Sequence, residues 1–156
     1  MEPVLIAGID PGLATGGLVL VRSGRTDRED EVIDAKSLVA TKKEIAEAKR
    51  EALELVAENN WGDKAFVTAC LRADLWVSHC IEALVRMEKE HGHITCIGIE
   101  SFVDQPSRAK VMMQLRWQTL LLMGVLSAAL EKEGYSLRNK RIIYQNAGVV
   151  LKQWKA

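Results

Sequence analysis

Two acidic residues, Asp10 and Glu100, stand directly after short apolar segments of the sequence. Residues 4–10 (VLIAGID) and 94–100 (ITCIGIE) each indicate a buried strand that ends in the acid. A carboxylate beside hydrophobic strands costs several kcal/mol unless it is hydrogen-bonded, paired or bound to a metal. Two carboxylates close together repel each other and favour a divalent cation, and oxygen-only ligation suits Mg²⁺ or Mn²⁺.

Hydrolysis of a phosphodiester is the chemistry that such a pair of acids suits. Two divalent ions roughly 4 Å apart can activate water and stabilise the leaving oxygen. The alternative to a metal-binding role is a structural role for each acid. Asp10 would simply begin the turn at Pro11, and Glu100 would simply cap the helix that follows. The nearby glycines match neither a Walker loop nor a dinucleotide-binding loop in their spacing. We expect them to form a tight turn that leaves the tip of the first strand open.

Hydrophobic periodicity and turn signals predict the elements that must position these acids. Three apolar segments form a strand meander, and two helices follow, the first begun by a capping box of Thr41 and Glu44. The expected strands cover residues 4–10, 16–21, 31–39, 94–100 and 141–144, and the expected helices cover 41–58, 64–88, 107–133 and 147–154. This order predicts an α/β fold with a mixed sheet, in which function collects at the carboxyl ends of the parallel strands.

Composition suits one soluble globular domain, because 48% of the 156 residues are hydrophobic and 27% are charged. No apolar run reaches the roughly 20 residues of a membrane span, and the N-terminus lacks the basic start of a signal peptide. The three cysteines are Cys70, Cys80 and Cys96, and none has CxxC spacing. We therefore expect reduced, core-type thiols, no structural zinc site and a cytoplasmic protein.

Charge is distributed unevenly along the chain although the formal net charge is zero. Residues 101–156 carry 9 basic and 3 acidic side chains, whereas residues 1–100 carry more acids than bases. Such a basic third is either a solvated helix face or a surface that meets phosphate. Charge alone does not separate these two interpretations.

Two segments around the acids resemble motifs of a known family. Residues 8–12 (GIDPG), with Thr15 and Gly16, resemble the first motif of the RuvC-type Holliday-junction resolvases, which belong to the RNase H-like superfamily. Residues 99–103 (IESFV) resemble the second motif. The helix that opens with Ser107 and the segment 144–152 are also similar to that family, the latter in the manner of its phage-type members. The similarity covers most of the chain in order and spacing.

The resemblance implies an RNase H-like mixed five-stranded sheet flanked by helices in a single domain, residues 1–156. It implies a homodimer that cleaves branched DNA in recombination and repair and depends on Mg²⁺, with Mn²⁺ able to substitute. Asp10 and Glu100 would be its metal ligands, and Phe102 falls near an aromatic residue that the family places close to the junction. The implied phosphate contacts are Arg108, Lys110 and Arg116. A core phenylalanine and ordinary helix-surface charges are the alternatives for these four residues.

Two features depart from the family pattern. Residues 41–63 indicate a helical insertion of unknown role. The family completes its site with acids, or an acid and a histidine, on the last helix, but residues 134–156 contain no Asp, Glu or His. Asp104 is the possible substitute ligand, although its place before Pro106 predicts a loop. We expect either a shortened version of a longer protein or a nuclease fold with an incomplete site.

Three other functions stay open at this point. A module that binds branched nucleic acid without cutting would keep the fold and the basic patch. An actin-like ATPase or sugar kinase begins with a similar strand and glycine turn but needs a second such domain. An RNase H-like protein of RNA processing is the third, since the first motif does not distinguish RNA from DNA. For assembly, we expect Trp76, Trp117 and Met123 to lie outside the core and meet a second subunit.

Overall fold

The computed structural model describes residues 3–13, 15–24, 30–60, 62–101 and 109–146, with the side chains there except those of 101, 109–116 and 146. The strands are β1 (Val4–Asp10), β2 (Gly16–Ser23), β3 (Glu31–Leu38), β4 (Ile94–Ser101) and β5 (Ile142–Asn146). The helices are α1 (Lys42–Asn59), α2 (Lys64–His91) and α3 (Ala109–Lys132). Every element expected in these ranges is present, and the expected helix at 147–154 lies outside the described residues.

The five strands form one sheet in the order β3-β2-β1-β4-β5. Antiparallel pairing joins β1 to β2 and β2 to β3, as a meander requires. Parallel pairing joins β1 to β4 and β4 to β5, so the chain crosses over through helices between them. The expected α/β fold, a mixed five-stranded sheet flanked by helices, is confirmed. Its consequence for function is that β1, β4 and β5 have their carboxyl ends at the same edge.

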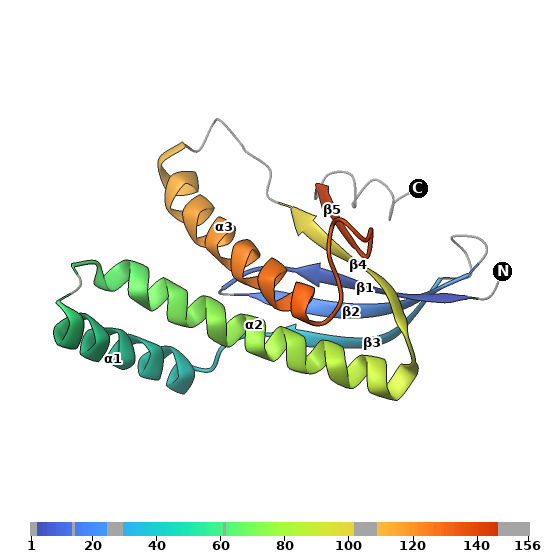
Figure 1. The fold of residues 1–156 in the computed structure, drawn as a ribbon, viewed down its shortest axis with the longest axis horizontal. Coiled ribbons are helices and arrows are strands. Elements are labelled where there is room, and N and C mark those ends of the chain that lie inside the picture. Colours follow the sequence, from blue (N-terminus) through green and yellow to red (C-terminus); the bar gives the residue numbers. More distant parts are fainter. Residues whose placement is uncertain (1–2, 14, 25–29, 61, 102–108, 147–156) are drawn as a thin grey trace.

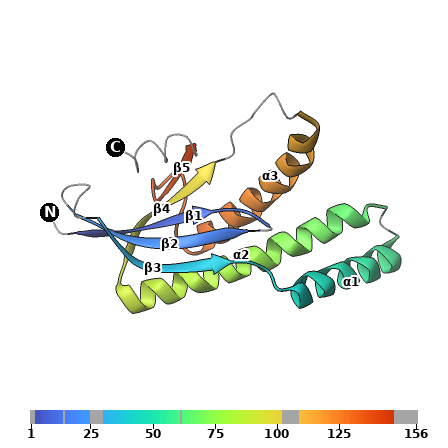
Figure 2. The ribbon, with the colours of Figure 1, turned by 180° about the vertical axis from the view of Figure 1, so that it is seen from behind.

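Helices α2 and α3 pack against one face of this sheet and against each other, while α1 lies along the outer side of α2 (Figures 1 and 2). Alternate residues of β1, which are Leu5, Ala7 and Ile9, are buried beneath the helices. The face of α3 that covers them consists of three buried residues, Leu122, Leu126 and Leu130. None of the helices within the described ranges is both long and apolar enough to cross a membrane.

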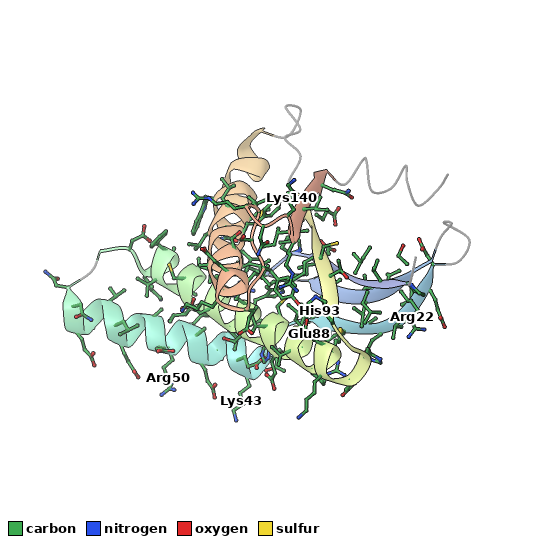
Figure 3. All side chains as sticks on the ribbon, turned by 45° about the vertical axis from the view of Figure 1, so that its right-hand side comes forward. Arg22, Lys43, Arg50, Glu88, His93 and Lys140 are labelled. Atoms are coloured by element: carbon green, nitrogen blue, oxygen red, sulfur yellow. The ribbon has the colours of Figure 1, made fainter. Side chains whose placement is uncertain are left out.

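The segment 41–63 contains the expected helix, α1. The helix begins with the predicted capping box of Thr41 and Glu44. The Thr41 hydroxyl accepts a hydrogen bond from the Glu44 N–H at 3.1 Å, and the Glu44 carboxylate accepts one from the Thr41 N–H at 2.8 Å. Only small residues, Ala48 and Ala52, are buried on α1, where it packs on α2. Its labelled side chains, Lys43 and Arg50, extend away from the sheet (Figure 3). That this helix is an insertion into a family pattern stays a prediction.

Two side chains of α2 lie opposite to expectation. Trp76, predicted outside the core, is only 2% exposed, and its Nε1–H donates a hydrogen bond to the Leu38 carbonyl at 3.1 Å. Phe66 begins an apolar stripe with helical spacing, which predicts that it packs with the rest of the stripe, but it is 47% exposed; the stripe consists of Phe66, Cys70, Ala73, Val77, Cys80, Leu84 and Met87. The reason is that the first turns of α2 extend beyond the sheet, where Phe66 stacks on Trp117 of α3 with ring centroids 6.0 Å apart (Figure 1). Met123, also predicted outside the core, packs against it in a half-buried position.

The three cysteines are free, and they differ in environment. Cys80 is buried in the core, and burial raises the pKa of its thiol to about 12. Cys70 and Cys96 are half-buried, so only Cys80 is the core-type thiol that the sequence predicts for all three.

A polar network stabilises the end of the molecule that lies opposite the first turns of α2. It joins Glu88 of α2 to Ile94 of β4 and to Tyr135. The Tyr135 hydroxyl donates a hydrogen bond to the Glu88 carboxylate at 2.6 Å, and the Ile94 N–H donates to the same oxygen at 3.2 Å. The Arg141 guanidinium lies 4.1 Å from the centre of the Tyr135 ring and donates hydrogen bonds to the carbonyls of Ile94, Thr95 and Gly134. Arg141 therefore has a structural role, although the sequence placed it in the basic third.

Replacing Tyr135 with Phe is expected to destabilise the protein by about 2 kcal/mol at neutral pH, since a hydrogen bond to a charged acceptor is lost. That hydrogen bond is the main reason why the pKa of Glu88 is lowered. A lowered carboxyl pKa contributes stability that is present above about pH 4.5 and is lost as the pH falls through the folded pKa. The difference between wild type and Tyr135→Phe should therefore shrink at pH 3, as urea unfolding at both pH values would show.

Tyr144→Phe is the matched control for this prediction. Its hydroxyl is hydrogen-bonded to the neutral Ser127 hydroxyl of α3. This variant should lose about 1 kcal/mol at either pH, because no ionisable group takes part. An equally pH-independent loss for Tyr135→Phe would contradict the account of the Glu88 network.

Candidate metal site

The structure brings Asp10 and Glu100 together, as the sequence predicts. Asp10 is the last residue of β1, and Glu100 lies one residue before the end of β4. These two strands are parallel neighbours, and Ile9 pairs with Ile99 in their register. Asp10 and Glu100 follow that pair, so they lie side by side at the carboxyl edge of the sheet. Ninety residues of sequence separate them, and only the crossover through α2 makes them neighbours.

Both acids lie on the sheet face that α2 and α3 do not cover. Ile9 and Ile99 are buried beneath the helices, and consecutive side chains on a strand point to opposite faces. Around the acids this second face includes three residues without side chains, Gly8, Gly98 and Gly17, with the Val19 side chain beside Gly8. Further along the face, Val32 is 56% exposed and Ile143 is 45% exposed. A large ligand such as a nucleic-acid backbone would therefore meet little obstruction from the described elements.

The electrostatics of the pair favour an added positive charge. Burial raises the pKa of Glu100 above its ordinary value, and the charge of Asp10 and a hydrogen bond between the two carboxyl groups raise it further. Within the described ranges, no Lys, Arg or His forms an ion pair with either acid. Two carboxylates without a counter-charge among the described residues suit Mg²⁺ or Mn²⁺, which bind proteins through one or two carboxylates and complete their coordination with water or phosphate oxygens. The residues present thus fit a hard divalent cation.

At Gly16 the backbone lies close to the end of β1 and to the ring of Trp76, which the sequence does not reveal. A Cβ atom at this position would lie 2.8 Å from the Asp10 carbonyl oxygen and 2.7 Å from Cζ2 of Trp76. Gly16 therefore lies between the Asp10 carbonyl and the buried ring of Trp76, with no room for a side chain. The sequence predicts a glycine turn here, but the packing of an indole ring against it depends on where α2 crosses the sheet.

The other predicted site residues fall in parts of the chain about which less is described. Phe102, Asp104 and Arg108 lie outside the described residues. Lys110 and Arg116 lie on α3, where only the backbone is described. Their roles as junction, ligand and phosphate contacts therefore stay predictions.

A second group of ionisable side chains joins α2 to β3 on the helical side of the sheet. The Asp34, Glu90 and His91 ligand atoms all lie within 4.8 Å of one another. Arg86 already lies among them, with Nη1 3.2 Å from Glu90 and 3.5 Å from Asp34, and His91 Nε2 is 3.1 Å from Asp34. Since Arg86 supplies the positive charge, this group is better described as an ion-pair cluster than as a metal site.

Two surface clefts among the described residues lie away from the acidic pair. One of about 400 Å³ opens between β3, α1 and α2, where Glu44 and His79 form an ion pair at 2.9 Å. Another, of about 670 Å³ and mostly apolar, lies beside the turn that joins α1 to α2. Asp10 and Glu100 line neither, which suits an acidic pair on an open sheet edge.

No protein-family model and no curated protein sequence matches this chain. Similar solved structures include Thermus thermophilus RuvC in complex with a Holliday junction substrate (13% identity, TM-score 0.46) and a further T. thermophilus RuvC structure (14% identity, TM-score 0.45). The Aquifex aeolicus PPX-GPPA enzyme is also similar (9% identity, TM-score 0.44). Each similarity covers 92% of this chain, but only 64% of the RuvC chains and 36% of PPX-GPPA. The fold assignment of this chain therefore rests on its own strand order and pairing, the mixed five-stranded sheet flanked by helices described above.

Proposed function

We propose that this chain is an RNase H-like endodeoxyribonuclease that depends on Mg²⁺ and hydrolyses phosphodiester bonds in Holliday junctions or related branched DNA. The observation that carries the proposal is the pairing of Asp10 and Glu100 at the carboxyl edge of β1 and β4, without a basic partner among the described residues. The resemblance of residues 8–12 and 99–103 to the resolvase motifs selects branched DNA among the possible phosphodiester substrates.

Asp10 and Glu100 would hold the cation through their carboxylate oxygens. When bound, a divalent cation supplies charge stabilisation and a water of lowered pKa for in-line hydrolysis. Burial and the neighbouring charge of Asp10 raise the pKa of Glu100, and a bound cation would offset both effects. The glycine-lined face beside the acids lets a phosphate backbone approach the pair closely. Asp104 is the proposed substitute for a further acidic ligand.

The basic last third of the chain would contact the substrate. Arg108, Lys110 and Arg116 are the proposed phosphate contacts, and Phe102 is proposed to lie near the junction. A homodimer would place two acidic pairs about a two-fold axis, which matches the two symmetric strands of a four-way junction. Trp117, half-buried and stacked on the exposed Phe66, remains the described aromatic residue best placed for a subunit contact.

A binding module without catalysis is the second candidate function. The observation that favours it is the absence of Asp, Glu and His from residues 134–156, where the resembled family carries further ligands. In that case the chain would bind branched DNA with an affinity that falls steeply with salt, and it would release no products.

Cleavage of a labelled four-way DNA junction in Mg²⁺ and in Mn²⁺ tests the proposal. We expect symmetric cuts by the wild type and a loss of at least about 100-fold for Asp10→Asn, because a metal-ligand carboxylate is worth several kcal/mol in the transition state. Asp74→Asn, an exposed position on α2, is the matched control and should cut normally. A mobility shift on the same junction separates the two candidates: binding without cuts by the wild type would favour the second. Absence of both binding and cuts would contradict both.

A further inference from the structure

A third polar side chain, Gln145, stands beside the acidic pair. β5 runs parallel to β4, and Glu100 pairs directly with Gln145 in their register. Neighbouring strands are about 4.8 Å apart, so a long side chain at 145 reaches the group at 100. Asp10, Glu100 and Gln145 thus form one row across three adjacent strands, with Glu100 in the middle.

Gln145 points to the same face as the two acids. The preceding residue, Tyr144, packs against the core and is hydrogen-bonded to Ser127 of α3, so it faces the helices. Since side chains alternate along a strand, Gln145 faces the opposite side. Glu100 faces that side for the same reason, because Ile99 before it is buried beneath the helices.

The chemistry of a carboxamide suits this position. Its oxygen is a neutral ligand for hard divalent cations, and it adds no charge to the two carboxylates that already repel each other. Gln145 is half-buried, and within the described ranges it makes no hydrogen bond that would occupy this oxygen. Residues 134–156 contain no acid or histidine, so a ligand from this part of the chain must be of another kind.

We propose that the Gln145 side-chain oxygen is a third ligand of the cation held by Asp10 and Glu100. This inference rests on the proposed function and adds to it a residue that the sequence motifs do not single out. The alternative is that Gln145 makes no contact with the cation. This alternative predicts that Gln145→Met binds the metal as tightly as the wild type.

Titration of the 156-residue chain with Mn²⁺ in a calorimeter tests the ligand without reference to cleavage. Gln145→Met, nearly equal in volume but with a soft thioether, is expected to weaken Mn²⁺ binding at least about 10-fold. Gln145→Glu is expected to strengthen it, because a carboxylate replaces a neutral oxygen. Gln118→Glu on α3, on the helical side of the sheet, is the matched control and should leave the affinity unchanged. Thermal unfolding without metal checks that each variant is folded.

The outcomes separate this proposal from the one it rests on. Loss of binding in Asp10→Asn together with unchanged binding in both Gln145 variants would overturn the role of Gln145 and leave the acidic pair in place. Absence of Mn²⁺ binding by the wild type, or normal binding by Asp10→Asn, would overturn the acidic pair and Gln145 with it. If Gln145→Met fails to fold, Gln145→Ala decides the matter, because it also removes the ligand oxygen, adds no charge and is expected to show the same loss of affinity.

Discussion

Replacing Glu100 with Gln is expected to abolish cleavage and, in the absence of metal, to make the protein more stable at neutral pH. Cleavage falls by at least about 100-fold because the variant lacks an anionic ligand. Stability rises because the charged Glu100 is half-buried beside Asp10, with no counter-charge among the described side chains. Because solvent screens this partly exposed pair, the expected gain is at most about 1 kcal/mol, which shifts the unfolding midpoint of a domain of this size by about 2–4 °C.

The stability gain has a defined pH dependence. Because the pKa of Glu100 is raised on folding, the folded protein binds more protons than the unfolded chain between about pH 4.5 and the folded pKa. Wild-type stability therefore falls, relative to Glu100→Gln, as the pH rises through this interval. Below about pH 4.5 the two proteins should differ little, since the carboxyl group is then neutral in both states.

Thermal unfolding in a chelator at several pH values measures this difference. Glu58→Gln, an exposed position on α1, is the control and should follow the wild type throughout. A stability gain of Glu100→Gln that is equal at pH 4 and pH 8 would show that charge repulsion at the pair is not its cause. Saturating Mn²⁺ should reverse the order of stabilities, because only the wild type binds the ion tightly.

Gly16→Ala is expected to have the second large effect, acting on both stability and the site. The added methyl group would collide with the Asp10 carbonyl oxygen and with the buried ring of Trp76. Neither can withdraw freely, since one is backbone in a paired strand and the other is hydrogen-bonded to Leu38 in the core. We expect a loss of about 3 kcal/mol in unfolding free energy and weaker Mn²⁺ binding, because the end of β1 must shift.

The neighbouring glycine provides the control for this variant. A Cβ atom at Gly17 would have the Lys36 carbonyl oxygen as its nearest contact, at 3.7 Å, an ordinary van der Waals distance. Gly17→Ala should therefore unfold within about 0.5 kcal/mol of the wild type, and it serves as the control for stability. Equal losses in the two variants would mean that flexibility at this turn, and not the contact with Trp76, is what matters.

The strand-end acids could be predicted from sequence because local signals define them. Residues 4–10 and 94–100 are short apolar segments that each end in an acid, and helix caps such as Thr41 and Gly92 mark where the intervening helices begin and end. Given a mixed sheet, parallel pairing of the two strands is enough to place Asp10 beside Glu100. The same reasoning does not find Gln145, because its significance depends on the register of β5 against β4.

Side-chain environments on α2 could not be predicted, because they depend on where the helix meets the sheet. Val77 belongs to the apolar stripe of α2, and Trp76 precedes it in the sequence. Helical periodicity predicts that Val77 is buried, but it does not predict that Trp76 is buried as well. Room for the indole ring comes from Gly16 on another element. Phe66 belongs to the same periodic stripe but lies past the edge of the sheet, so it stacks on Trp117 and stays 47% exposed. The cluster of Asp34 with His91 likewise forms through packing of residues far apart in sequence.

The most direct test of the central claim is a crystal structure of the protein soaked in Mn²⁺, with the ion located by its anomalous scattering. The account predicts an anomalous peak between the carboxylates of Asp10 and Glu100, at about 2.2 Å from an oxygen of each. A peak at the cluster of Asp34, Glu90 and His91, with none between Asp10 and Glu100, would contradict it.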